Sequence, residues 1–201
     1  MVNNKIKKQI VLSSDNKNKI KEIKEIIKDL PIEILSKKDI GCQDLEVDEK
    51  YDTLEENALV KAEIIKRYTK NPVIADDTGL FVEELGGEPG VHSARYSGDH
   101  DDQANRNKLL SKLKDSKDRS AYFKTIIVYI GEDGKKEYFE GICKGHITKE
   151  ERGENGFGYD SIFQAEGYNK TFAEMTDDEK NFISHRRKAI EKLEEFLKKQ
   201  I

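Results

Sequence analysis

Short apolar segments alternate with charged segments along the first part of the chain. Residues 9–13 read QIVLS, and PIEIL at 31–35 and PVIA at 72–75 have the same brief apolar character, which is typical of buried strands. Between the first two segments the apolar positions recur at helical spacing, at Ile20, Ile23, Ile27 and Leu30. This order predicts a strand, a polar turn, an amphipathic helix and a second strand.

Helix-start signals mark three further segments. Thr53 and Glu56 form a T-x-x-E capping pattern, and the apolar stripe that follows consists of Leu54, Ala58, Ala62 and Ile65. Residues 99–114 are expected to form a helix with an acidic first turn. Thr176 is the expected cap of one last helix, whose buried face is Ile183, Ile190, Leu193 and Leu197.

Residues 121–130 and 135–147 read as two strands joined by GEDG, which predicts a hairpin. Strands and helices that alternate early, followed by a hairpin, predict an α/β fold with a mixed sheet. The chain contains three prolines and no Ser/Gly-rich tract. We therefore expect residues 1–201 to form a single domain, without two parts joined by a flexible linker.

Composition and charge narrow the class of protein. The net charge of -4 argues against a general nucleic-acid binder, but a few local cations could still bind a small phosphorylated ligand. Cys42 and Cys143 form no CxxC pattern, which makes structural zinc unexpected and fits a reducing cytosol. The N-terminus is polar and no apolar run approaches membrane-spanning length. These features predict a soluble, cytoplasmic protein with no membrane partner.

Two adjacent carboxylates, Asp76 and Asp77, follow the apolar run at 72–75. Like charges side by side are costly unless something compensates them, and a metal ion is the usual compensation. If a strand ends here, the acids lie where open α/β sheets bind ligands, one facing the ligand and the other a partner. Glu46, Asp48 and Glu49, just before the second expected helix, could add a further carboxylate. A simple turn is the alternative, because Asp, Thr and Gly are good turn residues.

The segment SSDNKNK at 13–19 lies at an expected turn between a strand and a helix. Backbone N–H groups at a helix N-terminus bind anions, and Lys17 or Lys19 could add positive charge. The segment lacks the glycines of a P-loop, so it is not a Walker motif. The alternative is an ordinary helix cap followed by a solvated lysine face.

Two later segments suggest recognition of a base. In GFGYDSIF at 156–163, an aromatic residue between two glycines can stack on a base, although a bulge in a core strand fits equally well. In EKNFISHRRKA at 179–189, Lys180 and Ser184 are four residues apart, so they share a face of the expected helix. His185 reads on its own as a plain surface residue. Together, carboxylates, lysines and an aromatic residue indicate a small nucleoside phosphate with Mg²⁺.

At this point the sequence closely resembles the Ham1-like inosine triphosphate pyrophosphatases. The matching segments are SSDNKNKIKEI, TLEENALVKA, ADDTGLFVEELGGEPGVHSARYSGD, GFGYDSIF and FAEMTDDEKNFISHRRKA, in family order and over nearly the whole chain. The resemblance implies an α/β fold with two lobes around a central cleft. It also implies Mg²⁺-dependent hydrolysis of ITP, dITP and XTP to the monophosphate and pyrophosphate, by a homodimer that removes non-canonical purines from the nucleotide pool.

The resemblance further implies roles for individual residues. Asp77 matches the general base and a metal-linked acid, and Glu49 matches the family's acidic metal position. The implied substrate-binding residues are Ser14, Asp15, Asn16, Lys17, Asn18, Lys19, Lys61, Thr78, Phe157, Gly158, Tyr159, Asp160, Lys180, His185 and Arg186.

Two other classes of function use parts of the same set of residues. A regulatory module that binds a nucleotide without turnover would keep the phosphate loops but would not need the paired acids. A metal-dependent phosphatase would use the acids and release orthophosphate, and a nuclease would need the basic groove that the net charge argues against.

Overall fold

The computed structural model describes residues 8–14, 16–45, 47–98 and 100–200. Its strands form one seven-stranded sheet in the order β2-β1-β3-β5-β6-β7, and β4 pairs with β3 beside this path. The strands are β1 Lys8–Leu12, β2 Ile32–Ser36, β3 Val73–Val82, β4 Pro89–Gly90, β5 Ser120–Ile130, β6 Lys136–Ile147 and β7 Phe163–Ala165. The α-helices are α1 Lys17–Ile26, α2 Leu54–Lys66, α3 Asp102–Lys112, α4 Asp177–Ile183 and α5 His185–Lys198. Short 3₁₀ helices cover Lys38–Ile40, Glu83–Leu85, Ser93–Arg95, Asp160–Ile162 and Phe172–Glu174.

The sheet is mixed, as the sequence predicts. β1 pairs in parallel with β2 and β3, whereas β3 with β4 and β6 with β7 are antiparallel pairs. β5 and β6 are neighbours in the sheet and are joined by the short turn at 131–135. The prediction of an α/β fold with a mixed sheet is therefore confirmed.

The described chain divides into two compact units. The first contains the residues up to Asp77 together with 126–140 and the segment from Ala189 onward. The second contains 78–125 and 141–188. The boundary therefore cuts β3 between its fifth and sixth residues, and it also cuts β5, β6 and α5.

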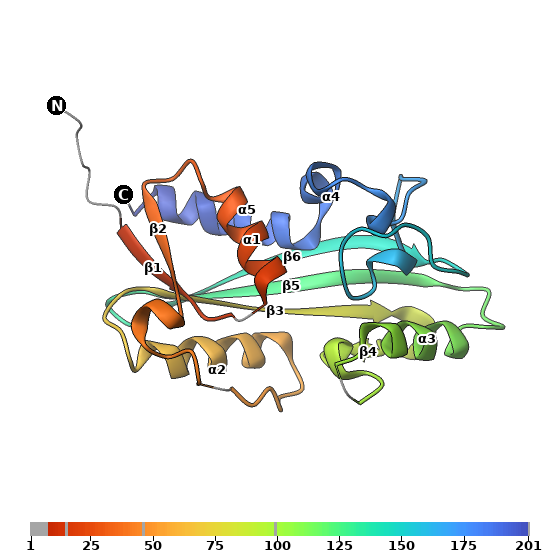
Figure 1. Ribbon diagram of the computed structural model, residues 1–201, viewed down its shortest axis with the longest axis horizontal. Helices are drawn as coiled ribbons and strands as arrows, with labels where there is room; N and C mark the ends of the chain where they lie inside the picture. Colours follow the sequence, from red (N-terminus) through yellow and green to blue (C-terminus); the bar gives the residue numbers. More distant parts are fainter. Residues whose placement is uncertain (1–7, 15, 46, 99, 201) are drawn as a thin grey trace. The chain divides into compact units, whose positions relative to one another are not determined.

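The first unit places helices on both sides of its strands. Figure 1 shows α1 and the C-terminal part of α5 on one side and α2 on the other. The predicted apolar positions are confirmed as core residues, because Ile23, Ile27 and Leu30 are buried and Ile20 packs against the same core. The helix itself is shorter than expected, since α1 ends at Ile26 and Leu30 lies in the turn that follows. This core also contains Ile10, Leu12, Ile32, Ile74, Ile127, Tyr129, Phe139, Ala189, Ile190, Leu193 and Leu197. The four predicted stripe residues of α2 are likewise buried.

The second unit has its own core, which is rich in aromatic side chains. The ring of Phe123 lies 4.7 Å from that of Phe163, measured between centroids, and Phe163 lies 5.0 Å from Phe172. Leu109 and Leu113, at the end of α3, are fully buried in the same core. These contacts attach α3 to the strands of this unit.

The expectation that a strand ends before the paired acids is wrong. β3 continues from Val73 to Val82, so Asp76 and Asp77 lie in its interior. The later half of the strand pairs with β4, with Leu80 opposite Gly90 and Phe81 opposite Pro89. This pairing overrides the turn preference of Asp, Thr and Gly, because strand preference depends strongly on tertiary context.

The expectation of one last helix is also wrong. α4 ends at Ile183 and α5 begins at His185, because Ser184 is extended at φ -66°, ψ 153°. The Ser184 hydroxyl accepts a hydrogen bond from the backbone N–H of Arg187 at 3.1 Å, so this serine caps α5. Lys180 and Ser184 therefore do not share one continuous helix face, and Ile183 is only partly buried.

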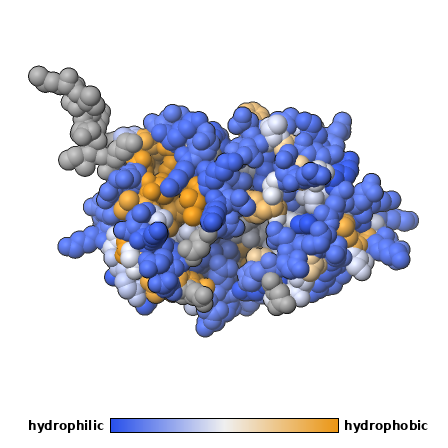
Figure 2. Space-filling model, viewed as in Figure 1, coloured by the Kyte–Doolittle hydropathy of each residue, from blue (hydrophilic) through white to orange (hydrophobic). Residues whose placement is uncertain are grey.

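The visible surface is mostly hydrophilic, which agrees with a charged fraction of 38% (Figure 2). None of the described helices is both long and apolar enough to cross a lipid bilayer.

Candidate active site

Two lysines neutralise the paired acids of β3, and they come from different helices. Lys19 Nζ, on α1, lies 2.8 Å from Asp76 Oδ2. Lys61 Nζ, on α2, lies 3.0 Å from Asp77 Oδ1. Since neighbouring side chains of a strand point to opposite faces, and α1 and α2 lie on opposite sides of the strands, each acid meets the lysine on its own side (Figure 1).

Glu49 joins this group through Lys61. Lys61 Nζ donates to Glu49 Oε1 at 2.7 Å, so one ammonium group bridges two carboxylates. Asn57 orders the segment after Glu49, because its buried amide bonds both the N–H and the C=O of Tyr51. We call Lys19, Glu49, Lys61, Asp76 and Asp77 the lysine–carboxylate cluster, and all five belong to the first unit.

The start of α2 is set by its cap. The Thr53 hydroxyl accepts a hydrogen bond from the backbone N–H of Glu56 at 3.2 Å, as the capping pattern predicts. The Glu56 carboxylate accepts from the same hydroxyl at 2.8 Å. The Ser13 hydroxyl donates to the Lys61 carbonyl at 3.0 Å and so ties this helix to the end of β1.

Burial and charge shift the pKa values in this cluster. Burial raises the pKa of the Asp77 carboxyl above its ordinary value, and the positive charges of Lys61 and Lys19 only partly oppose this effect. Burial acts to lower the pKa of the Lys61 ammonium, but the charges of Asp77, Glu49 and Asp76 outweigh it and the pKa rises. Lys61 is therefore a firmly charged cation, and Asp77 has the raised basicity that suits a general base.

The cluster has the donor chemistry of a magnesium site completed by a substrate. Asp77 Oδ2 is buried and makes no hydrogen bond to any described residue. No group of three or more His, Cys, Asp or Glu side chains in the described part of the chain could hold a metal by itself. Mg²⁺ commonly takes one or two carboxylates and receives its other oxygens from phosphates and water. Glu49 and Asp77 fit that pattern.

The predicted phosphate segment forms the turn before α1. Asn16 caps the helix, because its side-chain oxygen accepts from the N–H groups of Asn18 and Lys19 at 3.0 and 3.2 Å. The Ser14 hydroxyl accepts from the N–H of Asn16 at 3.3 Å, and Lys17 is exposed. Two of the N–H groups at this helix start thus already have a partner. Asp15 and Glu46 lie outside the described residues.

The predicted aromatic segment is a loop with a buried ion pair behind it. The side chain of Asp160 accepts from the Phe157 N–H at 2.9 Å and from Lys180 Nζ at 2.8 Å. Lys180 Nζ also lies 4.8 Å from the centroid of the Phe157 ring. Tyr159 is 5% exposed and its hydroxyl donates to the Ser93 carbonyl, so it packs in the core of the second unit.

The first residues of α5 lie close to Thr78 and Phe157. The His185 ring stacks on Phe123 at a centroid distance of 4.6 Å and is buried, so it is not the plain surface residue that its position alone suggests. The guanidinium carbon of Arg186 lies 5.9 Å from the centroid of the Phe157 ring. Its Nη2 donates to the Thr78 hydroxyl at 3.5 Å, and that hydroxyl is 2.8 Å from the hydroxyl of Thr125.

Among the expected site residues, the structure brings Lys19, Glu49, Lys61 and Asp77 together in the first unit. In the second unit it brings Thr78, Phe157, Asp160, Lys180 and Arg186 together. Ser14, Asn16, Lys17 and Asn18 form the turn before α1, and Tyr159 packs in the core of the second unit.

The structure also adds partners that the sequence did not reveal. One of these partners is Thr125, which is fully buried on β5. It opens the run TIIVYI, whose other residues are aliphatic or tyrosine, and a threonine in such an apolar run could have indicated a hydrogen-bonding role. Asp102 and Arg106, on α3, contact the aromatic loop, and their sequence gives no such signal.

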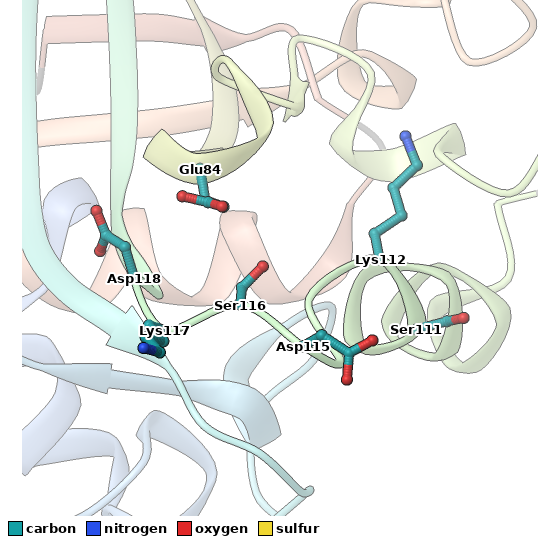
Figure 3. A pocket seen from close by; sticks show the side chains of 7 residues that line it. All are labelled: Glu84, Ser111, Lys112, Asp115, Ser116, Lys117 and Asp118. Carbon is teal, nitrogen blue, oxygen red and sulfur yellow. The ribbon is translucent and has the colours of Figure 1, made fainter.

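The second unit contains two cavities. One, of about 560 Å³, lies at the C-terminal end of α3 and is lined by Glu84, Ser111, Lys112, Asp115, Ser116, Lys117 and Asp118 (Figure 3). The other, of about 600 Å³, is lined by residues of β5, β6 and β7 and the segment 166–169. Neither cavity contains any of the expected site residues.

Comparison with known proteins shows the family of this chain. A model of the Ham1 family matches residues 10–196. The chain is 46% identical over 198 residues to a dITP/XTP pyrophosphatase of Caldanaerobacter subterraneus subsp. tengcongensis, covering 96% of this chain and 98% of that protein. It is 44% identical over 195 residues to a dITP/XTP pyrophosphatase of Bacillus subtilis, with coverage of 96% and 98%. The structure of the Staphylococcus aureus Ham1 protein superimposes with a TM-score of 0.88 at 42% identity, over 96% of this chain and all of the other. This chain belongs to the Ham1 family.

Proposed function

We propose that this protein is a Mg²⁺-dependent nucleoside-triphosphate pyrophosphohydrolase. It converts ITP, dITP and XTP to the monophosphate and pyrophosphate, and it removes these non-canonical purines from the cytoplasmic nucleotide pool as a homodimer. The observation that supports the reaction most directly is the lysine–carboxylate cluster, in which Lys61, Asp76 and Asp77 are buried, in a chain whose relatives are named dITP/XTP pyrophosphatases.

In this mechanism the acids of the cluster bind the metal and accept a proton, and the lysines stabilise negative charge. Asp77 has one oxygen bonded to Lys61 and the other, Oδ2, free to accept a proton from the water that attacks the α-phosphorus. The raised pKa of this carboxyl makes it a better proton acceptor than an exposed aspartate. Lys19 and Lys61 offset the negative charge of the departing pyrophosphate. Glu49 and Asp77 would hold Mg²⁺, which supplies charge neutralisation and an activated water.

The second group of residues supports recognition of the purine. Phe157 offers a half-buried ring for stacking, and Arg186 and His185 are nearby hydrogen-bond donors. Hypoxanthine and xanthine present a keto oxygen at position 6, which accepts from such donors, whereas adenine presents an amino group. A buried mismatch of this kind costs about 1–3 kcal/mol, which disfavours ATP by roughly one to two powers of ten.

Product analysis tests the reaction. The protein is incubated with Mg²⁺ and, in parallel, ITP, XTP, GTP and ATP, and the products are resolved as monophosphate, diphosphate, pyrophosphate and orthophosphate. We expect IMP or XMP with one equivalent of pyrophosphate, and slow turnover of GTP and ATP. A diphosphate with orthophosphate would mean attack at the terminal phosphate and would overturn the mechanism. Tight binding without turnover would favour a regulatory module.

The role of Asp77 is tested by Asp77→Asn, with Asp44→Asn as the matched control. The amide keeps the size of the side chain but cannot accept the proton, so we expect kcat to fall by about a thousandfold or more. Asp44 is an exposed acid of the same unit, and its variant should keep full activity. An active Asp77→Asn protein would refute the assignment.

A further inference from the structure

Two side chains of α3 bind both backbone groups of one residue in the aromatic loop (residues 156–160). The Gly158 N–H donates to Asp102 Oδ2 at 2.8 Å, and Arg106 Nη1 donates to the Gly158 carbonyl at 2.7 Å. Gly158 has a positive φ of 61°, a conformation that favours glycine. The α3 pair, Asp102 and Arg106, therefore fixes the peptide groups on both sides of a residue that would otherwise be conformationally free.

Arg106 is itself fixed from behind. Its Nε lies 2.9 Å from Glu151 Oε2, and its Nη2 donates to Gln103 Oε1 at 2.8 Å. Glu151 also accepts from the Ser161 hydroxyl at 2.9 Å. The guanidinium group thus uses its fork of donors on three partners at once, which leaves it little rotational freedom.

The loop is held at its other end by the Asp160 carboxylate, which accepts from the Phe157 N–H. Phe157 lies between this bond and the bonds of the α3 pair to Gly158, so its backbone is fixed on both sides. The direction in which the Phe157 side chain leaves the backbone is consequently fixed by bonds from α3 on one side and by a bond within the loop on the other. A ring oriented before the ligand arrives saves the entropy of ordering it on binding.

The α3 pair is not required to attach α3 to the rest of the unit. Leu109 and Leu113 are fully buried, and Asn105 bonds the Ser97 N–H and the Ala94 carbonyl. Asp102 is exposed, whereas the Arg106 side chain is 15% exposed. Among the residues that the structure describes, the one partner that Asp102 and Arg106 share is the loop, which points to a role in positioning it.

We propose that Asp102 and Arg106 are positioning residues that orient Phe157 for stacking on the purine ring of the substrate. The proposal rests on the proposed function, in which this loop contacts the base. It implies that loss of the α3 pair weakens binding of ligands that have a base and leaves binding of the bare phosphate chain unchanged.

The test compares two probes on the same variants. IMP has the base, and inorganic tripolyphosphate has only the phosphate chain; both dissociation constants are measured by calorimetry at one Mg²⁺ concentration. For Arg106→Ala and Asp102→Ala we expect Kd for IMP to rise about tenfold, which corresponds to about 1.4 kcal/mol. The Kd for tripolyphosphate should stay within about twofold of the original value.

Conservative variants and a control separate positioning from a general loss of structure. Arg106→Lys keeps a donor for the Gly158 carbonyl and Asp102→Asn keeps an acceptor for its N–H, so both should recover most of the affinity for IMP. Ser111→Ala removes an exposed side chain near the other end of the same helix and should bind both probes normally. In turnover of ITP, Arg106→Ala should raise KM and leave kcat within about twofold.

An unchanged Kd for IMP in both alanine variants would overturn the proposal, and so would an equal loss of affinity for both probes. Failure of the unaltered protein to bind IMP would overturn it as well. Because these binding measurements need no turnover, they stay informative if the unaltered protein releases no pyrophosphate. Absence of pyrophosphate release would overturn only the proposed function.

Discussion

Lys61→Met would test whether the lysine–carboxylate cluster is held together by Lys61. Methionine keeps an unbranched chain of similar length, so the variant removes the charge and leaves little cavity. In the structure the side chains of Lys61 and Asp77 are 11% and 8% exposed, whereas that of Glu49 is 33% exposed. Asp77 therefore loses its direct cationic partner while buried, and Glu49 can regain water.

The expected loss of stability follows from this burial. Removing one partner of a buried ion pair costs about 3–5 kcal/mol, and the charge of Lys19 near Asp77 favours the lower end, about 3 kcal/mol. For a chain of this size that loss lowers Tm by roughly 6–12 °C. The double variant Lys61→Met/Asp77→Asn leaves no uncompensated charge at either position, so it should recover about 2 kcal/mol of the loss.

The assay is urea unfolding of the metal-free protein, followed by circular dichroism and tyrosine fluorescence. The midpoint should fall with an unchanged m-value, since m reflects the surface exposed on unfolding. Lys50→Met is the matched control, because its pair with Asp48 is solvent-exposed, and it should leave the midpoint unchanged. A loss below about 1 kcal/mol for Lys61→Met, or a double variant that is less stable still, would refute this account.

The pH dependence of the same variant gives an independent check. The pKa of Asp77 is already raised in the folded protein, and loss of Lys61 raises it further. Between the ordinary pKa and the raised pKa, the folded state binds more protons than the unfolded state, so the protein loses stability as the pH rises through this interval. The unfolding free energy of Lys61→Met should therefore fall more steeply than that of the unaltered protein as the pH rises above the ordinary pKa of an aspartate, about 4.

Three further predictions concern the loop, a thiol and the metal. Gly156→Ala should raise KM for ITP severalfold, because Gly156 has φ 78° and an added Cβ would lie 2.1 Å from Asp160 Oδ2. Gly134→Ala is the kinetic control, because Gly134 has a similar φ but its added Cβ would meet no other atom. Burial raises the pKa of Cys143 to about 11, so at pH 8 about one thiol in a thousand is ionised and iodoacetamide should label it only after unfolding. Chelation by EDTA should abolish pyrophosphate release, and added Mg²⁺ should restore it; activity that survives chelation would contradict the metal requirement.

Local patterns predicted most of the fold because they agree with the tertiary structure. The stripes of α1 and α2, the cap at Thr53 and the mixed sheet follow from periodicity and capping alone. The extension of β3 through Asp76 and Asp77 cannot be predicted in this way, because it depends on pairing with β4 and on two lysines that are distant in the sequence. A one-dimensional pattern of turn-forming residues contains no information about those partners.

The break at Ser184 shows a different reason for failure. A serine within a segment of helical periodicity can either continue one helix or cap the start of a second. The spacing of the apolar residues Ile183 and Ile190 is compatible with both arrangements, so the sequence pattern does not distinguish them. At the site, the resemblance to a family named candidate residues but not what they contact. The bridge from Lys61 to Glu49 and the bonds of the α3 pair to Gly158 become visible only in the three-dimensional structure.

The division of the chain into two units limits how this protein can be recombined. The backbone passes from one unit to the other at 77/78, 125/126, 140/141 and 188/189, so no single crossover between two related genes exchanges a whole unit. A chimaera with a new second unit needs 78–125 and 141–188 from the same parent. Its first junction falls between Asp77 and Thr78, in the middle of a strand. New base specificity is therefore easier to obtain by changing side chains within the second unit than by exchanging that unit between relatives.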